Sequence, residues 1–335
     1  MTANTPGISF DNDGVCNYCK IYKPFSLYGE EQLLKLLNEY RGHGEYDCMV
    51  TISGGRDSSY TLLKLVKDYG MKVLALNYQN PYTHNQAIKN IQNMVRILDV
   101  DLIQISNPAE MHKKLLKHHL RVWLKHPDPA TIPFMCIGCK LPHIDFIKIA
   151  KKYGITCIIE GGNPLESTSF KVLALGLKRD STNKLFTLSN MPQLIRFGFR
   201  NIRYFANRYL PITIKSILFE NQYAIGPKLL GPNIDHIDLF HYIPWNEQDV
   251  ISRIRSELEW DFPNDKKTTW RFDCKIADLK DYLYFQTLGM TEKDDFYSKM
   301  ILENLITRDQ ALERLENETT LNADIIDEIL TDKLL

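Results

Sequence analysis

The residue types best suited to chemistry in this chain form one short turn, Ser53-Gly54-Gly55-Arg56-Asp57-Ser58. Two adjacent glycines let a backbone turn tightly and bring its N–H groups close to an anion. A helix that starts directly after such a turn adds its positive end and unpaired N–H groups. Because the serines add hydroxyl donors, the turn predicts a site for the phosphates of a nucleotide, formed by Ser53, Gly54, Gly55, Asp57 and Ser58.

The charged members of the turn, Arg56 and Asp57, are together with Ser58 the candidate catalytic residues. Asp57 suits a phosphate site if it orients the turn or helps to hold Mg²⁺, a cation that prefers oxygen ligands. Arg56 would neutralise phosphate charge or point to solvent. A plain strand-to-helix turn with Ser or Asp as helix cap is the simpler interpretation. All six residues of the turn fit a phosphate site, and the turn lies between a predicted strand and a predicted helix, so we favour phosphate binding. The turn is not a Walker A loop, because it lacks Gly-Lys-Ser/Thr.

The elements that would position this turn alternate between short apolar strands and helices. Strands are expected at 47–52, 72–77, 101–105 and 155–160, and helices at 29–40, 84–98, 108–126 and 141–153, besides one directly after the turn. This alternation predicts an α/β fold with a doubly wound, mostly parallel sheet and helices on both faces. Ligands of such sheets bind beyond the carboxyl ends of the strands.

Two further groups of residues follow predicted strands and would reach the same crevice. Gly161, Gly162 and Asn163 follow strand 155–160 and would bound the nucleotide or substrate pocket, the alternative being an ordinary strand-end turn. Asn77 ends strand 72–77 and would contact the base or ribose, the alternative being a turn residue. All four are therefore candidate nucleotide-binding residues.

Seven cysteines include two Cys-x-x-Cys pairs, Cys16/Cys19 and Cys136/Cys139. Two such pairs can make a four-cysteine zinc site, so we predict Zn²⁺ at these four residues. Because more than a hundred residues separate the pairs, spacing does not prove that they meet. The alternatives are a [4Fe–4S] cluster at Cys136, Cys139 and Cys274, a redox or persulfide relay at the second pair, and unligated thiols.

The segment 192–219 contains five Arg or Lys residues, no acidic residue and several aromatic residues. It could bind a nucleotide diphosphate, RNA, or, as an amphipathic helix, a partner or membrane surface. The simpler interpretation is a solvated cationic face over a local core, and no alternative clearly outweighs it.

Composition excludes several classes of protein. The 335 residues have a formal net charge of zero, so global charge favours neither nucleic acid nor membrane binding. No apolar run approaches the ~18 residues that span a bilayer. An odd number of cysteines and no apolar leader argue against a secreted disulfide scaffold, and we expect a cytoplasmic protein with reduced thiols.

The stretch from Thr51 to Ser58 resembles the SGGxDS loop of the PP-loop ATP pyrophosphatase superfamily. The resemblance implies an adenine nucleotide α-hydrolase-like fold that binds ATP with its pyrophosphate in the loop. It also implies that a substrate oxygen attacks the α-phosphorus, and that a nitrogen or sulfur nucleophile then displaces AMP from the substrate.

Thr5-Pro-Gly-Ile-Ser-Phe-Asp-Asn-Asp-Gly-Val-Cys-Asn-Tyr-Cys19 is similar to the start of N-acetyl-sugar amidotransferases of surface-polysaccharide and lipopolysaccharide synthesis. Those enzymes often carry a further cysteine upstream, which this chain lacks. The resemblance implies amidotransfer to an N-acetylated nucleotide sugar. Position 2 is Thr2, and the chain has no Cys/His triad signature, so ammonia is expected from a separate glutaminase partner.

Cys136-Ile-Gly-Cys139, a helix and Glu160-Gly-Gly-Asn163 resemble the tRNA-thiolation branch of the same superfamily. The first alternative is therefore a sulfurtransferase acting on tRNA or a small molecule through Cys136 and Cys139. The second is a non-catalytic ATP-binding subunit.

We expect three parts: an N-terminal cysteine-containing lead (1–24), an ATP-binding α/β domain (25–190) and a mainly helical substrate or partner region (191–335). The sequence leaves the oligomeric state open, with a homodimer as one option.

Overall fold

Five short strands form one parallel sheet in the order β3-β2-β1-β4-β5. A computed structural model describes residues 1–106, 109–177, 191–319 and 321–333. The strands are β1 (Cys48–Ile52), β2 (Val73–Tyr78), β3 (Asp101–Ile105), β4 (Cys157–Glu160) and β5 (Asp235–Asp238). The chain runs from β1 to β2 and β3 on one side and then returns to β4 and β5 on the other. The strand order therefore reverses between β1 and β4, which is where open α/β sheets bind ligands.

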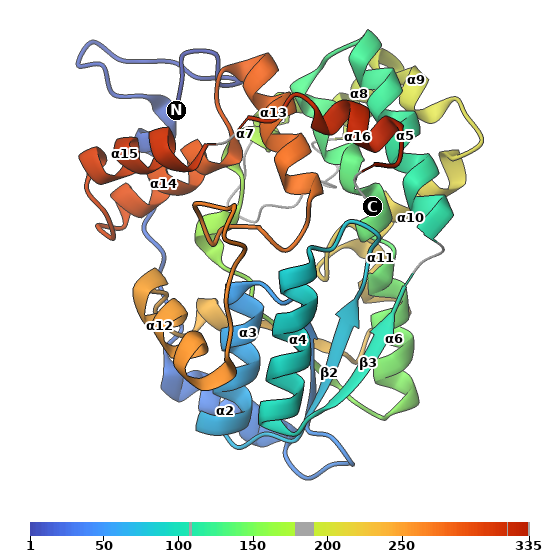
Figure 1. Cartoon of the computed structure of the whole chain (residues 1–335), viewed down its shortest axis with the longest axis vertical. Helices are drawn as coiled ribbons and strands as arrows, with labels where there is room; N and C mark the ends of the chain where they lie inside the picture. Colours follow the sequence, from blue (N-terminus) through green and yellow to red (C-terminus); the bar gives the residue numbers. More distant parts are fainter. Residues whose placement is uncertain (107–108, 178–190, 320, 334–335) are drawn as a thin grey trace.

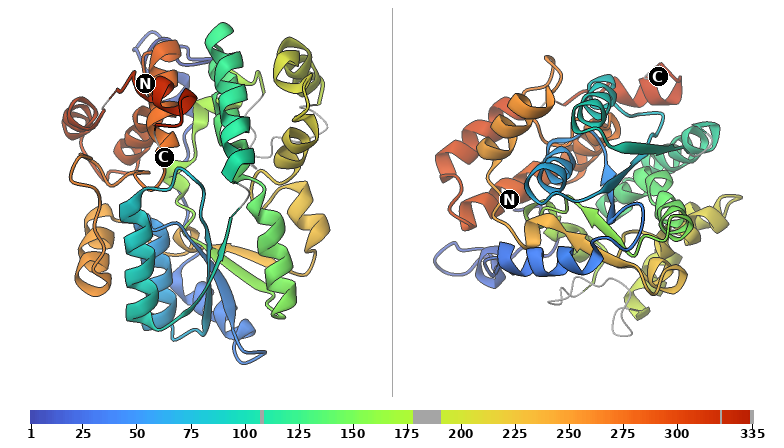
Figure 2. Two further views of the ribbon diagram at one scale, coloured as in Figure 1. Left: turned by 45° about the vertical axis from the view of Figure 1, so that its right-hand side comes forward. Right: turned by 90° about the horizontal axis from the view of Figure 1, so that it is seen from below.

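Helices cover both faces of the sheet, as Figures 1 and 2 show. One face carries α2 (Glu30–Tyr40), α3 (Arg56–Leu63), α4 (Asn85–Leu98) and α12 (Glu247–Leu258), and the other carries α6 (Pro142–Lys152). Successive strand residues point to opposite faces, so Val50 joins the first core and Met49 the second. The predicted doubly wound α/β class is confirmed.

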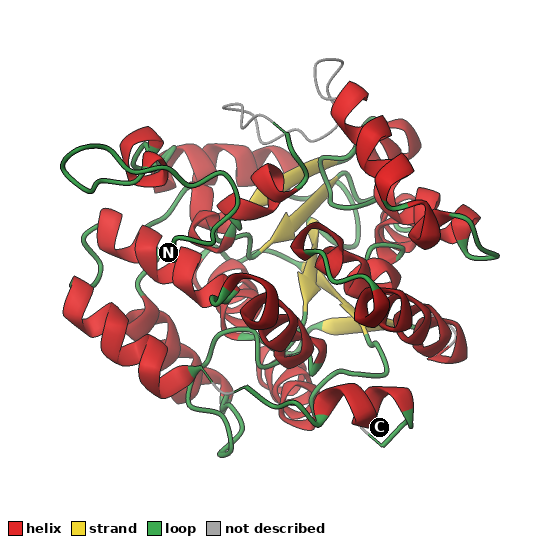
Figure 3. Cartoon of the chain, turned by 90° about the horizontal axis from the view of Figure 1, so that it is seen from above, coloured by secondary structure: helices red, strands yellow, loops and turns green. Residues whose placement is uncertain are grey.

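A further helical layer lies beyond the carboxyl ends of the strands (Figures 1 and 3) and contains its own hydrophobic core. Its elements come from distant parts of the chain. They include α1 (Asn17–Ile21), α5 (Ala109–Lys125), η2 (Pro129–Cys139), α7 (Ser169–Ala174), α9 (Ile202–Phe205), α13 (Ile276–Leu288) and α16 (Ile325–Leu330).

The remaining elements surround these two layers. They are η1 (Lys64–Asp68), a π-helical continuation of α3, then η3 (Pro164–Glu166), α8 (Met191–Arg200), α10 (Leu210–Leu218), α11 (Ile225–Leu230), η4 (Leu239–His241), α14 (Glu292–Leu302) and α15 (Arg308–Glu318). Within the described ranges, no helix combines the length and the apolar character needed to cross a bilayer.

The fifth strand was not expected from the sequence. β5 pairs with β4, with Cys157 opposite Asp235 and Glu160 opposite Asp238. The sheet therefore continues beyond the predicted α/β domain 25–190, and the region 191–335 is not purely helical. The predicted boundary at 190 and the predicted helix start at 108 lie outside the described residues.

The basic and aromatic segment 192–219 forms α8, α9 and α10 beside α5 (Figure 2). Tyr204 is buried, and its ring lies 5.2 Å from that of Phe134. Phe197 and Phe205 also contact the Phe134 ring. These aromatic side chains therefore form a local core, which agrees with the simplest of the interpretations given for this segment.

Candidate active site

The glycine turn between β1 and α3 is held in one shape by two other segments. Gly54 has a φ of +81°, and a Cβ there would lie 2.2 Å from the carbonyl oxygen of Ala87 in α4. The Gly54 carbonyl accepts hydrogen bonds from Asn90 Nδ2 and Trp260 Nε1, each at 3.0 Å. Only glycine fits this position, so the packing of α4 and the two hydrogen bonds fix the path of the turn at Gly54.

The serines of the turn bind its own backbone. The Ser53 N–H donates to Ser58 Oγ at 3.2 Å, and the Gly55 N–H donates to Ser53 Oγ at 3.3 Å. Gly55 is the N-cap of α3 and no side chain caps the helix. Its first-turn N–H groups therefore face the space in front of the turn, as an anion site requires.

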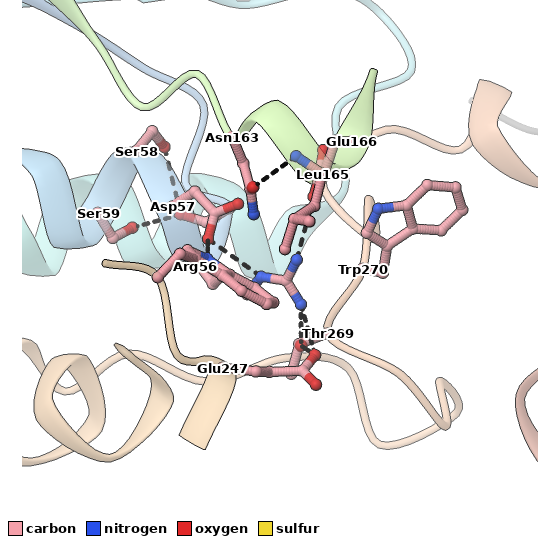
Figure 4. Close-up of polar contacts among 12 residues, drawn as sticks. Arg56, Asp57, Ser58, Ser59, Asn163, Leu165, Glu166, Glu247, Thr269 and Trp270 are labelled. Atoms are coloured by element: carbon pink, nitrogen blue, oxygen red, sulfur yellow. Dashed lines mark hydrogen bonds and ion pairs between the residues drawn. The ribbon is translucent and has the colours of Figure 1, made fainter. Parts of the chain in front are cut away.

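Arg56 lies at the centre of a cluster of ion pairs beside the turn (Figure 4). Its guanidinium is buried and forms ion pairs with Glu247 at 2.6 Å, Glu166 at 3.0 Å and Asp57 at 3.1 Å. It also lies 4.8 Å from the ring centre of Trp245. Burial opposes its charge, but the three carboxylates raise its pKa above the usual range. Arg56 therefore does not point to solvent, and its ion pairs tie the turn to neighbouring segments.

Two carboxylates face the space in front of the turn. Asp57 Oδ1 accepts hydrogen bonds from Trp245 Nε1 at 2.9 Å and from Arg56 Nε at 3.1 Å, which fixes its orientation. Asp273 also lines the cavity, and a Cβ on Gly55 would be 3.5 Å from its carboxylate. Burial raises the pKa of Asp273, and a hydrogen bond from Ser53 opposes that rise. Asp57 and Asp273 are the oxygen donors that could hold Mg²⁺ beside bound phosphates.

The turn opens into a cavity of about 650 Å³ at the carboxyl ends of β1, β2 and β4. Gly161 and Gly162 line the cavity, as predicted. Both positions need glycine because a side chain there would clash with neighbouring atoms. A Cβ on Gly161 would lie 2.9 Å from the Asp57 backbone, and one on Gly162 would lie 2.2 Å from Asp238 Oδ1. Gly161 therefore lets the end of β4 approach the turn closely, and Gly162 leaves room for Asp238 at the end of β5.

The two asparagines predicted to bind nucleotide have other roles. Asn77 is buried, and its Nδ2 donates to the Ile52 carbonyl at 2.8 Å, so it joins β2 to the end of β1 and does not line the cavity. Asn163 caps η3 by accepting from the Leu165 N–H at 3.0 Å. Its Nδ2 is buried with no hydrogen-bond partner among the described residues and lies beside Asp57 in Figure 4.

The five cysteines of the predicted metal sites divide into two groups. Cys136, Cys139 and Cys274 line the cavity, whereas Cys16 and Cys19 lie in the N-terminal lead with their sulfur atoms 3.4 Å apart. Among the described residues, no three His, Cys, Asp or Glu side chains are arranged to hold a metal ion. The predicted four-cysteine zinc site is therefore not formed.

The cavity cysteines are the residues of the alternative cluster prediction. The structure brings them to one cavity but not into a metal-binding arrangement. Burial raises the pKa of Cys274 to about 12 and that of Cys139 well above its usual range, so both are protonated thiols at neutral pH.

Neutral histidines accompany these thiols. His112 Nε2 lies 3.9 Å from Cys139 Sγ, and burial lowers its pKa to about 4. His143 lines the cavity and has a pKa of about 3 because of burial. Lys140, next to the second cysteine pair, also lines the cavity. Lys140 and His143, which follow the second cysteine pair, therefore face the cavity and not a solvated helix face.

Sequence reasoning assigned no role to several cavity residues. Asp273, Lys171, Arg271 and Lys280 come from segments without a motif, whereas Glu160 begins the Glu160-Gly-Gly-Asn163 stretch. Burial, with a smaller effect of Asp238, raises the pKa of Glu160 to about 8, so this carboxyl is mostly protonated at neutral pH. The sequence signals for Glu160 are its position at the end of a predicted strand and its place directly before Gly161.

Comparisons with known proteins give distant likenesses. No protein-family model matches the chain. An uncharacterized protein of Methanocaldococcus jannaschii is 29% identical over 100 residues, which is 29% of this chain and 36% of that relative's length.

Two of the similar solved structures are enzymes. NMN synthetase from Francisella tularensis has a TM-score of 0.40 at 13% identity, covering 90% of this chain and 92% of its own. The U34-tRNA thiolase NcsA from Methanococcus maripaludis with its [4Fe-4S] cluster has a TM-score of 0.34 at 12% identity, covering 82% of this chain and 80% of its own. Likenesses this distant decide neither fold nor function, for which the chain's own sheet and turn are the evidence.

Proposed function

We propose that this chain is an ATP pyrophosphatase of the PP-loop type. The observation that carries the proposal is the rigid glycine turn in front of an uncapped helix, opening into a charged cavity at the point where the strand order reverses. Backbone N–H groups in this position suit the β- and γ-phosphates of ATP. Asp57 and Asp273 would hold Mg²⁺, which would neutralise phosphate charge when bound.

The proposed reaction has two steps. An amide oxygen of the acceptor attacks the α-phosphorus, the bond from that phosphorus to the bridging oxygen breaks, and pyrophosphate leaves. A nucleophile then attacks the activated carbon, and the carbon–oxygen bond to AMP breaks. The chain's contribution is positioning and electrostatic stabilisation at the turn, with no covalent protein intermediate.

We further propose that the nucleophile is ammonia and the acceptor an N-acetylated nucleotide sugar. Ammonia attack turns the acetamido group into an acetamidino group and releases AMP and a proton. Support comes from the N-terminal stretch between Thr5 and Cys19 and its resemblance to sugar amidotransferases. In this proposal a separate glutaminase supplies the ammonia.

Sulfur transfer to tRNA or a small molecule is the second candidate. One observation favours it: Cys136, Cys139 and Cys274 line the same cavity as the turn. A sulfur nucleophile carried there would meet the adenylated acceptor. Iron and zinc analysis of protein purified without oxygen checks this candidate, because bound iron would favour it.

An isotope experiment tests the adenylation. The protein is incubated with ATP, ammonium and UDP-N-acetyl sugars that carry oxygen-18 in the acetamido group. Transfer of the label to AMP is expected, because the acceptor oxygen becomes bonded to the α-phosphorus. The mass of the sugar product distinguishes nitrogen from sulfur, and AMP without label would contradict acceptor adenylation.

A further inference from the structure

Three cations surround one buried carboxylate on the wall of the cavity. Glu292 Oε2 lies 2.9 Å from Lys280 Nζ and 2.9 Å from an Arg271 guanidinium nitrogen, and its Oε1 pairs with Lys171. These three cations, here named the basic trio, come from α7, the segment before α13, and α13 itself. Glu292 begins α14, where Thr291 is the N-cap. Four separate segments thus converge on one point.

The cations face the cavity and the carboxylate lies behind them. The side chains of Lys171 and Arg271 are 26% and 28% exposed, whereas that of Glu292 is 2% exposed. All three cations line the cavity and Glu292 does not. Arg271 also has a φ of +49°, a left-handed conformation that costs a non-glycine residue energy.

Glu292 is the one carboxylate that pairs with all three cations among the described residues. Arg271 also lies 3.5 Å from Glu166 and interacts electrostatically with Asp273. Within the part of the chain that the structure describes, the two lysines of the trio have only Glu292 as an ion-pair partner. Burial lowers the pKa of Lys171 to about 7, although Glu292 opposes that effect. Two lysines and an arginine that share one carboxylate and are only partly exposed have donors left for a further anion, so an anion from a ligand would stabilise the group.

The basic trio is separate from the glycine turn. A chain of ion pairs leads from Arg56 in the turn to Glu166, then to Arg271, and finally to Glu292. An anion on the trio would therefore lie on the far side of Glu166 from a pyrophosphate in the turn. A cavity of about 650 Å³ has room for both groups.

We propose that Lys171, Arg271 and Lys280 bind an anionic oxygen group, a phosphate or carboxylate, of the acceptor. This inference rests on the proposed function, because it assigns the turn to ATP and the trio to the second substrate. Arginine and lysine donors around one point suit such groups through charge-assisted hydrogen bonds. The trio would thus restrict the acceptor to an anionic molecule and fix its position relative to the α-phosphorus.

The test measures anion binding to protein whose turn is already filled. The full chain is saturated with α,β-methylene ATP and Mg²⁺ and then titrated with inorganic phosphate or with acetate by calorimetry. Binding of phosphate or acetate without displacement of the analogue is expected, and the better ligand of the two tells which group the acceptor carries. No binding of either anion, or release of the analogue, would overturn the inference.

Variants locate the anion. Lys171→Met is expected to weaken anion binding about tenfold, while α,β-methylene ATP binds as before. Lys148→Met, at a lysine that is 65% exposed on α6, is the matched control and should change neither. Lys280 is nearly buried. Lys280→Met is therefore combined with Glu292→Gln in one double variant, which removes a positive and a negative charge together. Unchanged anion affinity in folded Lys171→Met protein would overturn the assignment.

The same measurements distinguish a failure of the proposed function from a failure of the inference about the acceptor. If wild-type protein does not bind the ATP analogue, the proposed function fails. If it binds the analogue but the anion competes with it, the trio serves ATP, and only the inference about the acceptor fails.

Discussion

At the scale of single residues, Gly54 carries the strictest requirement of the site. Its φ of +81° is unfavourable for other residues, and a Cβ would lie 2.2 Å from a backbone oxygen of α4. We expect Gly54→Ala to lower the free energy of unfolding by at least about 2 kcal/mol and to abolish ATP binding. Urea denaturation and calorimetry with an ATP analogue measure both effects.

Gly42→Ala is the matched control. Gly42 has a φ of +73°, but nothing lies within 4 Å of an added Cβ, so only the backbone conformation is penalised. A loss of about 1 kcal/mol with normal ATP binding is expected. Equal losses in the two variants would show that the contact with α4 does not shape the turn.

Glu160 provides a prediction on pH. Its pKa is raised from 4.5 to about 8 in the folded chain. Between these values the folded state binds more protons than the unfolded state, so this residue lowers stability as pH rises. The Glu160→Gln variant should lose less stability than wild type between about pH 5 and about pH 8. Urea denaturation across this range measures both slopes, and parallel curves would contradict a buried, protonated Glu160.

At the scale of elements, Arg56 joins α3 to η3 and α12 through Glu166 and Glu247. Removing one partner of a buried ion pair leaves the other charges uncompensated. We therefore expect Arg56→Met to cost about 3–5 kcal/mol of stability, measured by urea denaturation. Loss of ATP binding should accompany it, because the turn would lose its connection to α12.

The matched control is Arg253→Met in α12. Arg253 pairs with Asp68 and Glu257, but its side chain is 28% exposed. Exposed ion pairs contribute about 1 kcal/mol or less. If Arg56→Met were no more destabilising than Arg253→Met, the buried cluster would not be what holds these elements together.

Local sequence predicted the elements whose signals are contiguous. β1 and β2 are apolar runs buried on both faces, and the turn residues are adjacent in sequence, so both were found. β5 was missed because Asp235-His236-Ile237-Asp238 has one apolar residue and lies at the edge of the sheet. The basic trio was missed because its residues are far apart in sequence and meet only through tertiary packing. Asn77 was misassigned because the end of a strand does not tell which way a side chain points.

At the scale of the whole molecule, the helical layer covers the carboxyl ends of the strands. It places cations and thiols in the cavity beside the glycine turn. In the amidotransfer proposal these thiols do not carry the nucleophile. Cys136→Ser is therefore expected to keep acceptor-dependent AMP formation within about twofold of wild type, a difference well under 1 kcal/mol. Loss of activity in folded Cys136→Ser protein would favour the sulfur route.

The central claim is that the turn binds the two outer phosphates of ATP and leaves the α-phosphorus open to attack. Phosphorus NMR of the products formed from ATP, with acceptor and ammonium present, tests it most directly. The account predicts AMP and pyrophosphate in equal amounts. ADP and inorganic phosphate as the products would contradict it.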